Sequence, residues 1–180
     1  MAPPLYWSVN NGVERMNKSM SNMPNITSEE HAPASASNTL ELVSFSIGEE
    51  LYGAEIMAVR EIRTWTGSTP LPNRMPFVRG VINFRGTMVP IIDLRARFGG
   101  GMTEPAKTSG VIVLSVENDL FGLLVDEVSD IISTAKADIK PVPDAGLLGN
   151  EFLAGIISVE EKMVGLLDLV AVAGRESQAA

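Results

Sequence analysis

The chain has 180 residues, of which 45% are apolar and 20% are charged, a composition typical of a globular protein with a sizeable core. It contains no cysteine, which excludes disulfides and thiolate chemistry, and its net charge of −8 disfavours a protein that wraps nucleic acid. No apolar stretch approaches the roughly 20 residues of a membrane span, and the N-terminal sequence lacks the pattern of a secretory signal. We therefore expect a cytoplasmic protein that does not insert into a membrane.

Residues 1–39 differ in composition from the rest of the chain. They are rich in Asn, Ser, Met, Pro and Ala, and they contain the single histidine, His31. Because they show no sustained apolar periodicity, they cannot bury enough surface to offset the entropy lost on ordering. We predict a disordered N-terminal tail over 1–39, one domain over 40–173, and a short C-terminal tail over 174–180.

The first part of the domain is predicted to be made of short β-strands. Apolar residues alternate with serines over 42–47, and a turn at 48–50 leads into a returning strand, which together predict a hairpin. A bend or short helical turn is expected at 56–58, where the alternation blurs, and a further strand over 59–64. Residues 66–76 contain one glycine and three prolines, and are predicted to be a loop.

A second hairpin is predicted over 78–93, with its turn at Arg85-Gly86. Pro90 lies inside the second of its strands. Since proline has no N–H to donate to a sheet, we expect Pro90 at a sheet edge or a bulge. Residues 94–98 could close one helical turn, and Gly99-Gly100-Gly101 is predicted to be a flexible connector to the remainder of the chain.

The remainder repeats this pattern. Residues 42–62 align with 111–131 at a constant offset of 69, and residues 80–94 align with 155–169 at an offset of 75. Because this period is longer than that of solenoid repeats, we interpret it as two copies of one small domain. The copies run over about 40–100 and 109–173, and exchange of strands between them is left open. One copy of about 60 residues would be only marginally stable alone.

The two copies differ in charge. Residues 40–100 carry seven Arg and six acidic residues, whereas residues 101–180 carry five basic and thirteen acidic residues. The copies thus share an apolar pattern but not a surface, and we expect them to face different partners.

No group of residues in the sequence indicates catalysis. The single histidine falls in the predicted tail, so we expect neither histidine-based catalysis nor a histidine metal site. The carboxylate pairs Asp126-Glu127 and Glu160-Glu161 are more typical of a solvated face than of a metal site. Gly99-Gly100-Gly101 is not followed by the Lys-Ser/Thr of a phosphate-binding loop. We therefore expect no enzyme, no cofactor and no metal.

Two charged residues stand out. Glu61 lies among apolar positions of a predicted strand, and Arg85 lies in the turn of the second hairpin. Their counterparts in the second copy are Asp130 and Glu160, so the basic member of the pair is absent there. On composition alone, a surface glutamate and a turn arginine are the simplest interpretation.

Three segments, however, resemble one protein family. LYGAEIMAVREIRT over 51–64, PLPNRMPFV over 70–78 and GVINFRGTMVPIIDLRARFG over 80–99 are similar to the motifs of the CheW-like family, which couples receptors to a kinase in bacterial chemotaxis. The resemblance extends over about 40–172. Phe84 stands where leucine is commoner, the N-terminal extension is long, and the C-terminal helix is shortened to 169–173.

This resemblance implies a mainly β fold, made of two pseudo-symmetric five-stranded Src-homology-3-like barrels with a hydrophobic groove between them and short helical turns. It implies a non-enzymatic adaptor, located in receptor arrays at the inner face of the membrane. The implied partners are the cytoplasmic hairpin tips of chemoreceptors and the regulatory domain of the histidine kinase CheA. Glu61 and Arg85 match receptor-binding positions, and Val43 and Met57 match positions in the groove where a receptor binds.

Two alternative functions remain open. The first is an adaptor of the same fold that serves a receptor–kinase pathway outside motility. The second, from a different class, is a small-barrel module that binds nucleic acid. Such a module needs a basic face studded with aromatic residues, and the ten aromatic residues of this chain are spread thinly.

Overall fold

The computed structural model describes residues 38–143 and 149–174 of the chain. The predicted tails lie almost entirely outside these residues, although Thr39 already belongs to the first strand. Among the described residues, no helix is long and apolar enough to cross a bilayer.

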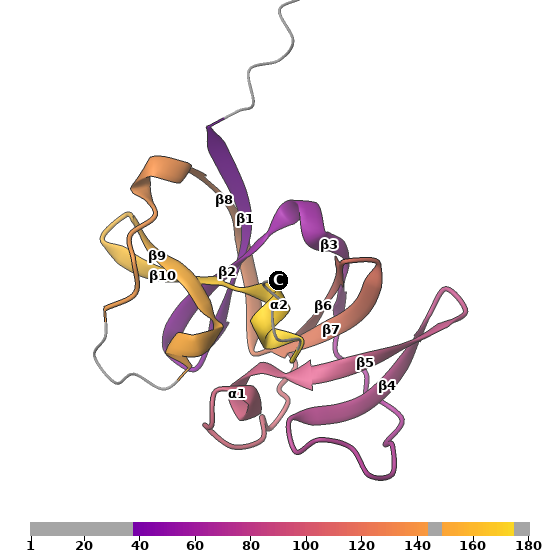
Figure 1. Ribbon diagram of the computed structural model, residues 1–180. Coiled ribbons are helices and arrows are strands. Elements are labelled where there is room, and N and C mark those ends of the chain that lie inside the picture. Colours follow the sequence, from indigo (N-terminus) through magenta and orange to yellow (C-terminus); the bar gives the residue numbers. More distant parts are fainter. Residues whose placement is uncertain (1–37, 144–148, 175–180) are drawn as a thin grey trace, which may run out of the picture. The chain divides into compact units, whose positions relative to one another are not determined.

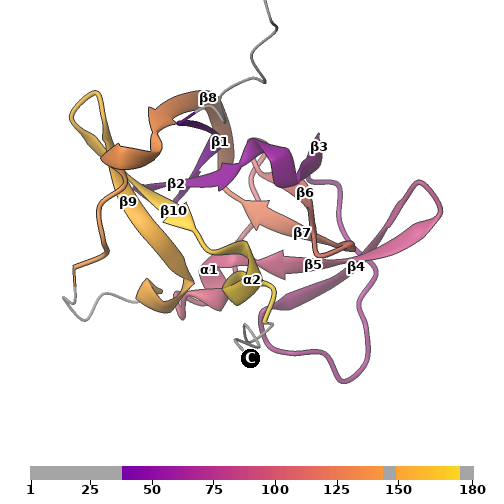
Figure 2. The same ribbon diagram turned by 45° about the horizontal axis from the view of Figure 1, so that its top comes forward.

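Ten strands form two five-stranded sheets, which we call the first and second barrel. The first barrel has the strand order β8-β1-β2-β10-β9, and the second has the order β3-β6-β7-β5-β4. Figure 1 shows the first barrel on the left and the second on the right, and Figure 2 shows the same division from another direction. The predicted fold class, mainly β with two five-stranded barrels, is confirmed. The strands of the first barrel are β1 (Thr39–Ile47), β2 (Glu50–Glu55), β8 (Glu127–Ala135), β9 (Leu153–Val159) and β10 (Lys162–Leu167). Those of the second are β3 (Val59–Thr64), β4 (Val78–Phe84), β5 (Thr87–Asp93), β6 (Gly110–Val116) and β7 (Asp119–Val125).

The helical elements are all short. They are η1 (Ile56–Ala58), α1 (Leu94–Arg97), η2 (Lys136–Asp138), η3 (Asn150–Phe152) and α2 (Leu169–Val172). The first two lie where the sequence predicts helical turns. Asp93 and Asp168 begin α1 and α2 as N-caps, because their carboxylates accept hydrogen bonds from backbone N–H groups of the first turn.

Each barrel combines strands from both halves of the chain. The first barrel takes β1 and β2 from residues 40–100 and β8, β9 and β10 from residues 109–173, and the second takes the complementary set. If each of the strands β1 to β5 is exchanged with the strand five places later in the chain, the strand order of one barrel becomes that of the other. The pairing register repeats as well: Val43 faces Ala54 in the first barrel, and Ile112 faces Leu123 in the second. The two barrels are thus pseudo-symmetric, with one hairpin of each half placed in the other half's barrel.

Both barrels contribute to one apolar core. Its buried residues include Phe45 and Tyr52 from the first barrel and Ile112, Leu114 and Leu123 from the second. The core positions expected from the two copies are Phe45, Ile47, Val81, Ile91, Leu114, Val116, Ile156 and Leu166. All of these are buried except two, Val116 and Ile156, which are half-buried. The hydrophobic groove implied between the barrels remains a prediction.

An arginine also joins the two barrels. The guanidinium of Arg97, at the end of α1, lies 4.1 Å from the ring centre of Phe77 and 4.6 Å from that of Phe152. Its Nη2 donates a hydrogen bond of 3.1 Å to the carbonyl of Ala171, in the last turn of α2. Burial in this position lowers the pKa of Arg97. Phe77 precedes β4 and Phe152 precedes β9, so Arg97 links equivalent parts of the two barrels.

Pro90 was predicted at a sheet edge or a bulge, and it is not at an edge, although the register of β4 against β5 shifts between Val78 and Gly80, next to its partner Val81. It lies in β5, between β4 and β7 in the strand order. Pro90 faces Val81, whose backbone N–H and carbonyl bond Thr69 instead of β5. The side of Pro90 that lacks an N–H therefore faces β7, and the pairing of β5 with β7 begins only at Ile91. An interior strand tolerates the proline because the ladder starts one residue later.

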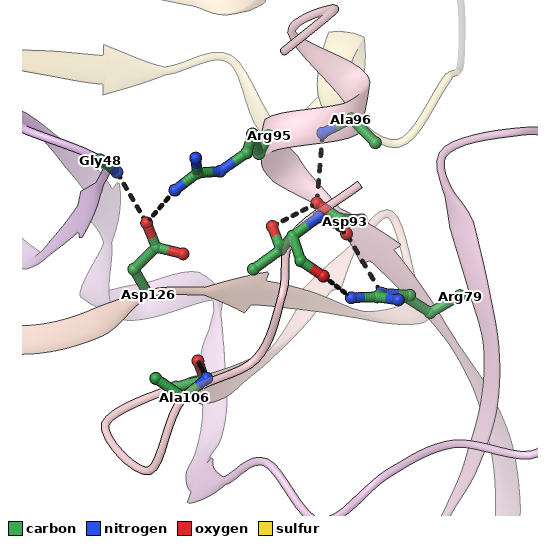
Figure 3. A network of polar contacts seen from close by, with 9 residues as sticks. Gly48, Arg79, Asp93, Arg95, Ala96, Ala106 and Asp126 are labelled. Carbon is green, nitrogen blue, oxygen red and sulfur yellow. Dashed lines mark hydrogen bonds and ion pairs between the residues drawn. The ribbon is translucent and has the colours of Figure 1, made fainter. Parts of the chain in front are cut away.

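The connector after α1 is also more ordered than a flexible glycine linker. Thr103, just beyond Gly101, is buried and donates hydrogen bonds to the buried carboxylate of Asp93 through its N–H and its hydroxyl, at 2.8 and 2.7 Å. Arg79 pairs with the same carboxylate, Nε to Oδ2 at 3.1 Å, and its Nη2 donates to the Thr103 carbonyl. Figure 3 shows this network beside α1. Asp93 thus fixes both the start of α1 and the end of the connector.

Candidate partner-binding surface

Glu61 and Arg85 come together on the second barrel. Glu61 lies on the edge strand β3, and Arg85 lies in the two-residue turn between β4 and β5. Arg85 Nη2 is 3.5 Å from Glu61 Oε2, so the structure brings the two side chains together. The side chain of Arg85 is 76% exposed and that of Glu61 is 34% exposed. Such a pair contributes only about 0–1 kcal/mol to stability, so its main effect is on what the surface can bind.

The turn that carries Arg85 is built from local geometry. Arg85 and Gly86 have φ angles of 50° and 86°, as both central residues of a type I′ turn require. The N–H of Gly86 donates to the side-chain oxygen of Asn83 at 2.8 Å, and the guanidinium carbon of Arg85 lies 5.1 Å from the ring centre of Phe84. The stacking on Phe84 restricts the arginine side chain, and the hairpin carries it toward β3.

Arg63 is a member of this cluster that the sequence analysis missed. Its Nε is 4.0 Å from Glu61 Oε1, so the two oxygens of one carboxylate face two different guanidinium groups. The signal was available in the sequence, because residues two apart on a strand point to the same face. Two arginines and one glutamate leave the cluster with a formal charge of +1.

Met57 adds an apolar element to the same region of the chain. It lies on η1, immediately before β3, and 80% of the residue is exposed. Ile62, between the two charged residues of β3, is 45% exposed. Among the described residues, Met57 is the most exposed of the large apolar side chains, so it is accessible to a partner. We refer to Met57, Glu61, Arg63 and Arg85 together as the β3 cluster.

Val43 lies in a different environment from the other three predicted site residues. It is on β1, pairs with Ala54 of β2 and Ile131 of β8, and is only 2% exposed. Its side chain belongs to the core shared by the two barrels. A direct contact between Val43 and a partner would require this core to open. The structure therefore brings Met57, Glu61 and Arg85 to the surface but not Val43.

The equivalent part of the first barrel has a different chemistry. Asp130 takes the place of Glu61, and its backbone N–H and carbonyl bond the hydroxyl of Ser44 at 3.0 and 2.8 Å. Glu160 takes the place of Arg85 in the turn between β9 and β10. The pseudo-symmetry of the fold thus does not extend to the β3 cluster. Within residues 38–143 and 149–174, no three His, Cys, Asp or Glu side chains gather as a metal site.

Comparison with known proteins points to one family. A model of the CheW-like domain matches residues 41–177. The chemotaxis protein CheW of Rhizobium meliloti (strain 1021) is 42% identical over 141 residues, covering 78% of this chain and 91% of the relative. The chemotaxis protein CheW of Klebsiella aerogenes is 37% identical over 140 residues, covering 77% and 84%.

A solved structure agrees with this result. The crystal structure of the scaffolding protein TtCheW from Thermoanaerobacter tengcongensis superposes with a TM-score of 0.68 and 34% sequence identity, covering 78% of this chain and 88% of that protein. The match in fold and the match in sequence each cover 78% of the chain, and both confirm the predicted resemblance. This chain belongs to the CheW-like domain family.

Proposed function

We propose that this protein is a non-enzymatic adaptor of bacterial chemotaxis that binds the cytoplasmic hairpin tips of chemoreceptors through the β3 cluster. The observation that carries the proposal is the Glu61–Arg85 pair, at 3.5 Å on the surface of the second barrel, together with the exposed Met57 on η1, directly before the strand that carries Glu61. An apolar side chain next to oriented charges suits a partner helix, which presents apolar anchors and polar residues on one face. The names of the relatives, chemotaxis protein CheW, support the pathway.

The second proposed partner is the regulatory domain of the kinase CheA, at receptor arrays on the cytoplasmic face of the membrane. An adaptor needs two non-equivalent surfaces, and the two barrels share a fold but differ at equivalent positions such as Arg85 and Glu160. Binding both partners transmits a receptor signal only if affinity for the kinase, or the state of the bound kinase, differs between receptor states.

The first test measures the affinity of a chemoreceptor cytoplasmic fragment for Glu61→Ala and Arg85→Ala. Truncating a charge that becomes desolvated in an interface costs roughly 2–5 kcal/mol of binding, so we expect each variant to bind at least about tenfold more weakly. Because the pair is exposed, both variants should melt within about 2 °C of the parent. Glu160→Ala, at the equivalent turn of the first barrel, is the matched control and should bind like the parent.

Two outcomes would contradict this assignment. If both variants unfold, the two residues are structural. If both bind the receptor fragment and support kinase activation like the parent, the β3 cluster is not the receptor-binding surface, even though the chain belongs to the family.

A further inference from the structure

A pocket of about 410 Å³ lies at the seam of the second barrel. The strands β3 and β4 are the two edges of this five-stranded sheet, and the pocket is lined by residues of both, together with the loop that follows β3. We call it the seam pocket. Its walls include Arg63, Trp65, Ser68, Thr69 and Asn83.

The walls of the seam pocket are held in place by backbone bonds. Thr69 and Val81 exchange two hydrogen bonds of 2.8 Å, which fix the loop after β3 against β4. The N–H of Trp65 donates to the carbonyl of Ser109 at 2.9 Å, which fixes the start of the same loop. Gly80 permits the close approach, because a Cβ there would lie 2.2 Å from the Thr69 carbonyl oxygen. The pocket is thus a built feature of the barrel.

The seam pocket is positively charged. Arg63 is the only charged residue among the described residues that line it, and hydroxyl and amide side chains make up much of the remaining wall. Arg63 also belongs to the β3 cluster, in which its Nε lies 4.0 Å from Glu61, and the two arginines and one glutamate of this cluster give it a formal charge of +1. A guanidinium beside hydroxyl groups is suited to a carboxylate, which accepts hydrogen bonds from both.

The other barrel provides an internal comparison. At the offset of 69, the counterpart of Arg63 is Ile132, which packs against the apolar cluster around Leu42 and Ile157. At the offset of 71, the counterpart of Thr69 is Lys140, which bonds Ile156 as Thr69 bonds Val81. The backbone of the seam is therefore duplicated, whereas its charged side chains are not: Ile132 takes the place of Arg63, and Lys140 takes the place of Thr69. The difference is not required by the fold.

We propose that the seam pocket binds the carboxylate of an aspartate or glutamate on the partner helix that docks over Met57, Glu61 and Arg85. Arg63 is then a specificity-determining residue, since it selects a partner with an acidic side chain at the position facing the seam. The identity of the partner rests on the proposed receptor-binding function, but the binding of a carboxylate at this site does not. The two parts are therefore tested separately.

The carboxylate site is tested on the full chain by nuclear magnetic resonance, with N-acetyl-L-glutamate as the probe and sodium chloride at matched ionic strength as the reference. Saturable shifts are expected at the Arg63 Nε–H and at the amides of Ser68 and Thr69. Arg63→Gln should abolish them, whereas Arg60→Gln, on the same strand but outside the pocket, should preserve them. A response that is equal in Arg63→Gln, or no larger than that to chloride, would overturn the site.

The partner is tested with the chemoreceptor cytoplasmic fragment. Arg63→Gln should bind about tenfold more weakly, while Arg60→Gln binds within about threefold of the parent. In the Arg63→Glu background, replacing one acidic residue of the fragment by lysine should restore binding, and no other acidic position should do so. If Arg63→Gln binds the fragment with the affinity of the parent, the partner assignment is wrong. The carboxylate site itself is then decided by the probe experiment. If the parent protein does not bind the fragment at all, the proposed function fails, and the probe experiment still decides the site.

Discussion

Asp93 and Asp168 occupy equivalent positions in the two halves, but Asp93 forms more interactions than Asp168. The buried carboxylate of Asp93 caps α1, holds Thr103 and pairs with Arg79. The half-buried Asp168 caps α2 with two bonds of 3.0 Å. At the offset of 75, the counterpart of Arg79 is Ala154, so no arginine faces Asp168 from that position. Variants of the two aspartates therefore distinguish the stability that a helix cap contributes from the stability that a buried charge pair contributes.

We predict that Asp93→Ala lowers the free energy of unfolding by about 3 kcal/mol or more, because it leaves the Arg79 charge and the Thr103 groups without their acceptor. Asp168→Ala removes only a cap and should cost about 1 kcal/mol. Urea unfolding of both variants measures the difference. Equal losses would show that Arg79 and Thr103 find other partners when Asp93 is removed.

Individual site residues were only partly predictable from the sequence. The resemblance singled out Glu61 and Arg85, and their proximity follows from β3 and the β4–β5 turn lying in the same barrel. Arg63 was missed because the resemblance marks only Glu61 and Arg85 as charged binding positions, and strand alternation, which places Arg63 beside Glu61, was not considered. Val43 was assigned to a groove, but alternation on β1 buries it in the shared core. Burial on a given face depends on which strands flank it, and this is a property of the tertiary structure.

The strands and turns were more predictable than the side chains. Alternation and turn residues located both hairpins of the first half, and the repeat located those of the second. Pro90 was misplaced because the rule against proline in interior strands assumes that every residue pairs on both sides. The pairing of β5 with β7 begins after Pro90, which no local pattern reveals. The glycine connector was called flexible because its anchor, Asp93, is ten residues away from Thr103.

Gly80 and Gly155 lie at equivalent positions in the two barrels, and each allows another segment of the chain to approach closely. Gly80 has φ of 152°, and a Cβ there would meet the backbone oxygen of Thr69 at 2.2 Å. At Gly155, a Cβ would meet the side chain of Ile139 at 2.4 Å and the backbone oxygen of Lys140 at 3.0 Å. The side chain of Ile139 can move more easily than the backbone of Thr69, whose N–H and carbonyl each form a hydrogen bond with Val81.

We predict that Gly80→Ala lowers the free energy of unfolding by about 3 kcal/mol, because it combines backbone strain with loss of the Thr69–Val81 bridge. Gly155→Ala should cost about half as much. Thermal unfolding compares the two variants, and the exchange rates of the Thr69 and Val81 amides report whether the bridge has opened. A smaller loss for Gly80→Ala than for Gly155→Ala would show that the loop after β3 shifts freely.

The exchange of hairpins between the barrels follows from the length of two connections. In the second barrel β3 pairs antiparallel with β6, and β6 with β7, so β7 runs parallel to β3. If one half closed on itself, β2 would take the place of β7 and would have to run parallel to β3. The chain leaving β2 would then have to travel back to the start of β3 over the length of a six-residue strand, about 20 Å. The three residues of η1 that connect β2 to β3 can span at most about 14 Å. Asp126 alone separates β7 from β8, which imposes the same limit on the other half.

The duplication was therefore visible in the sequence, while the exchange required a topological argument. Parallel neighbours need a crossover of about a dozen residues, and the predicted strands on either side of residues 56–58 leave no room for one. Exchange was left open because the alignment of the two copies alone does not show how each copy would close into a barrel. The exchange ties the stability of either barrel to both halves of the chain.

This dependence predicts that neither half folds as a monomer. A fragment of residues 38–101 contains β1 and β2 but lacks β8 and β10, with which they pair, and an isolated hairpin is at best marginally stable. A fragment of residues 102–174 lacks the complementary strands. Each fragment alone should show the circular dichroism of an unfolded chain, and mixing them should restore the β-sheet spectrum with a single cooperative melting transition. A monomeric fragment, as judged by sedimentation, with dispersed amide resonances would show that one half can close on itself and that the short connections do not impose the exchange.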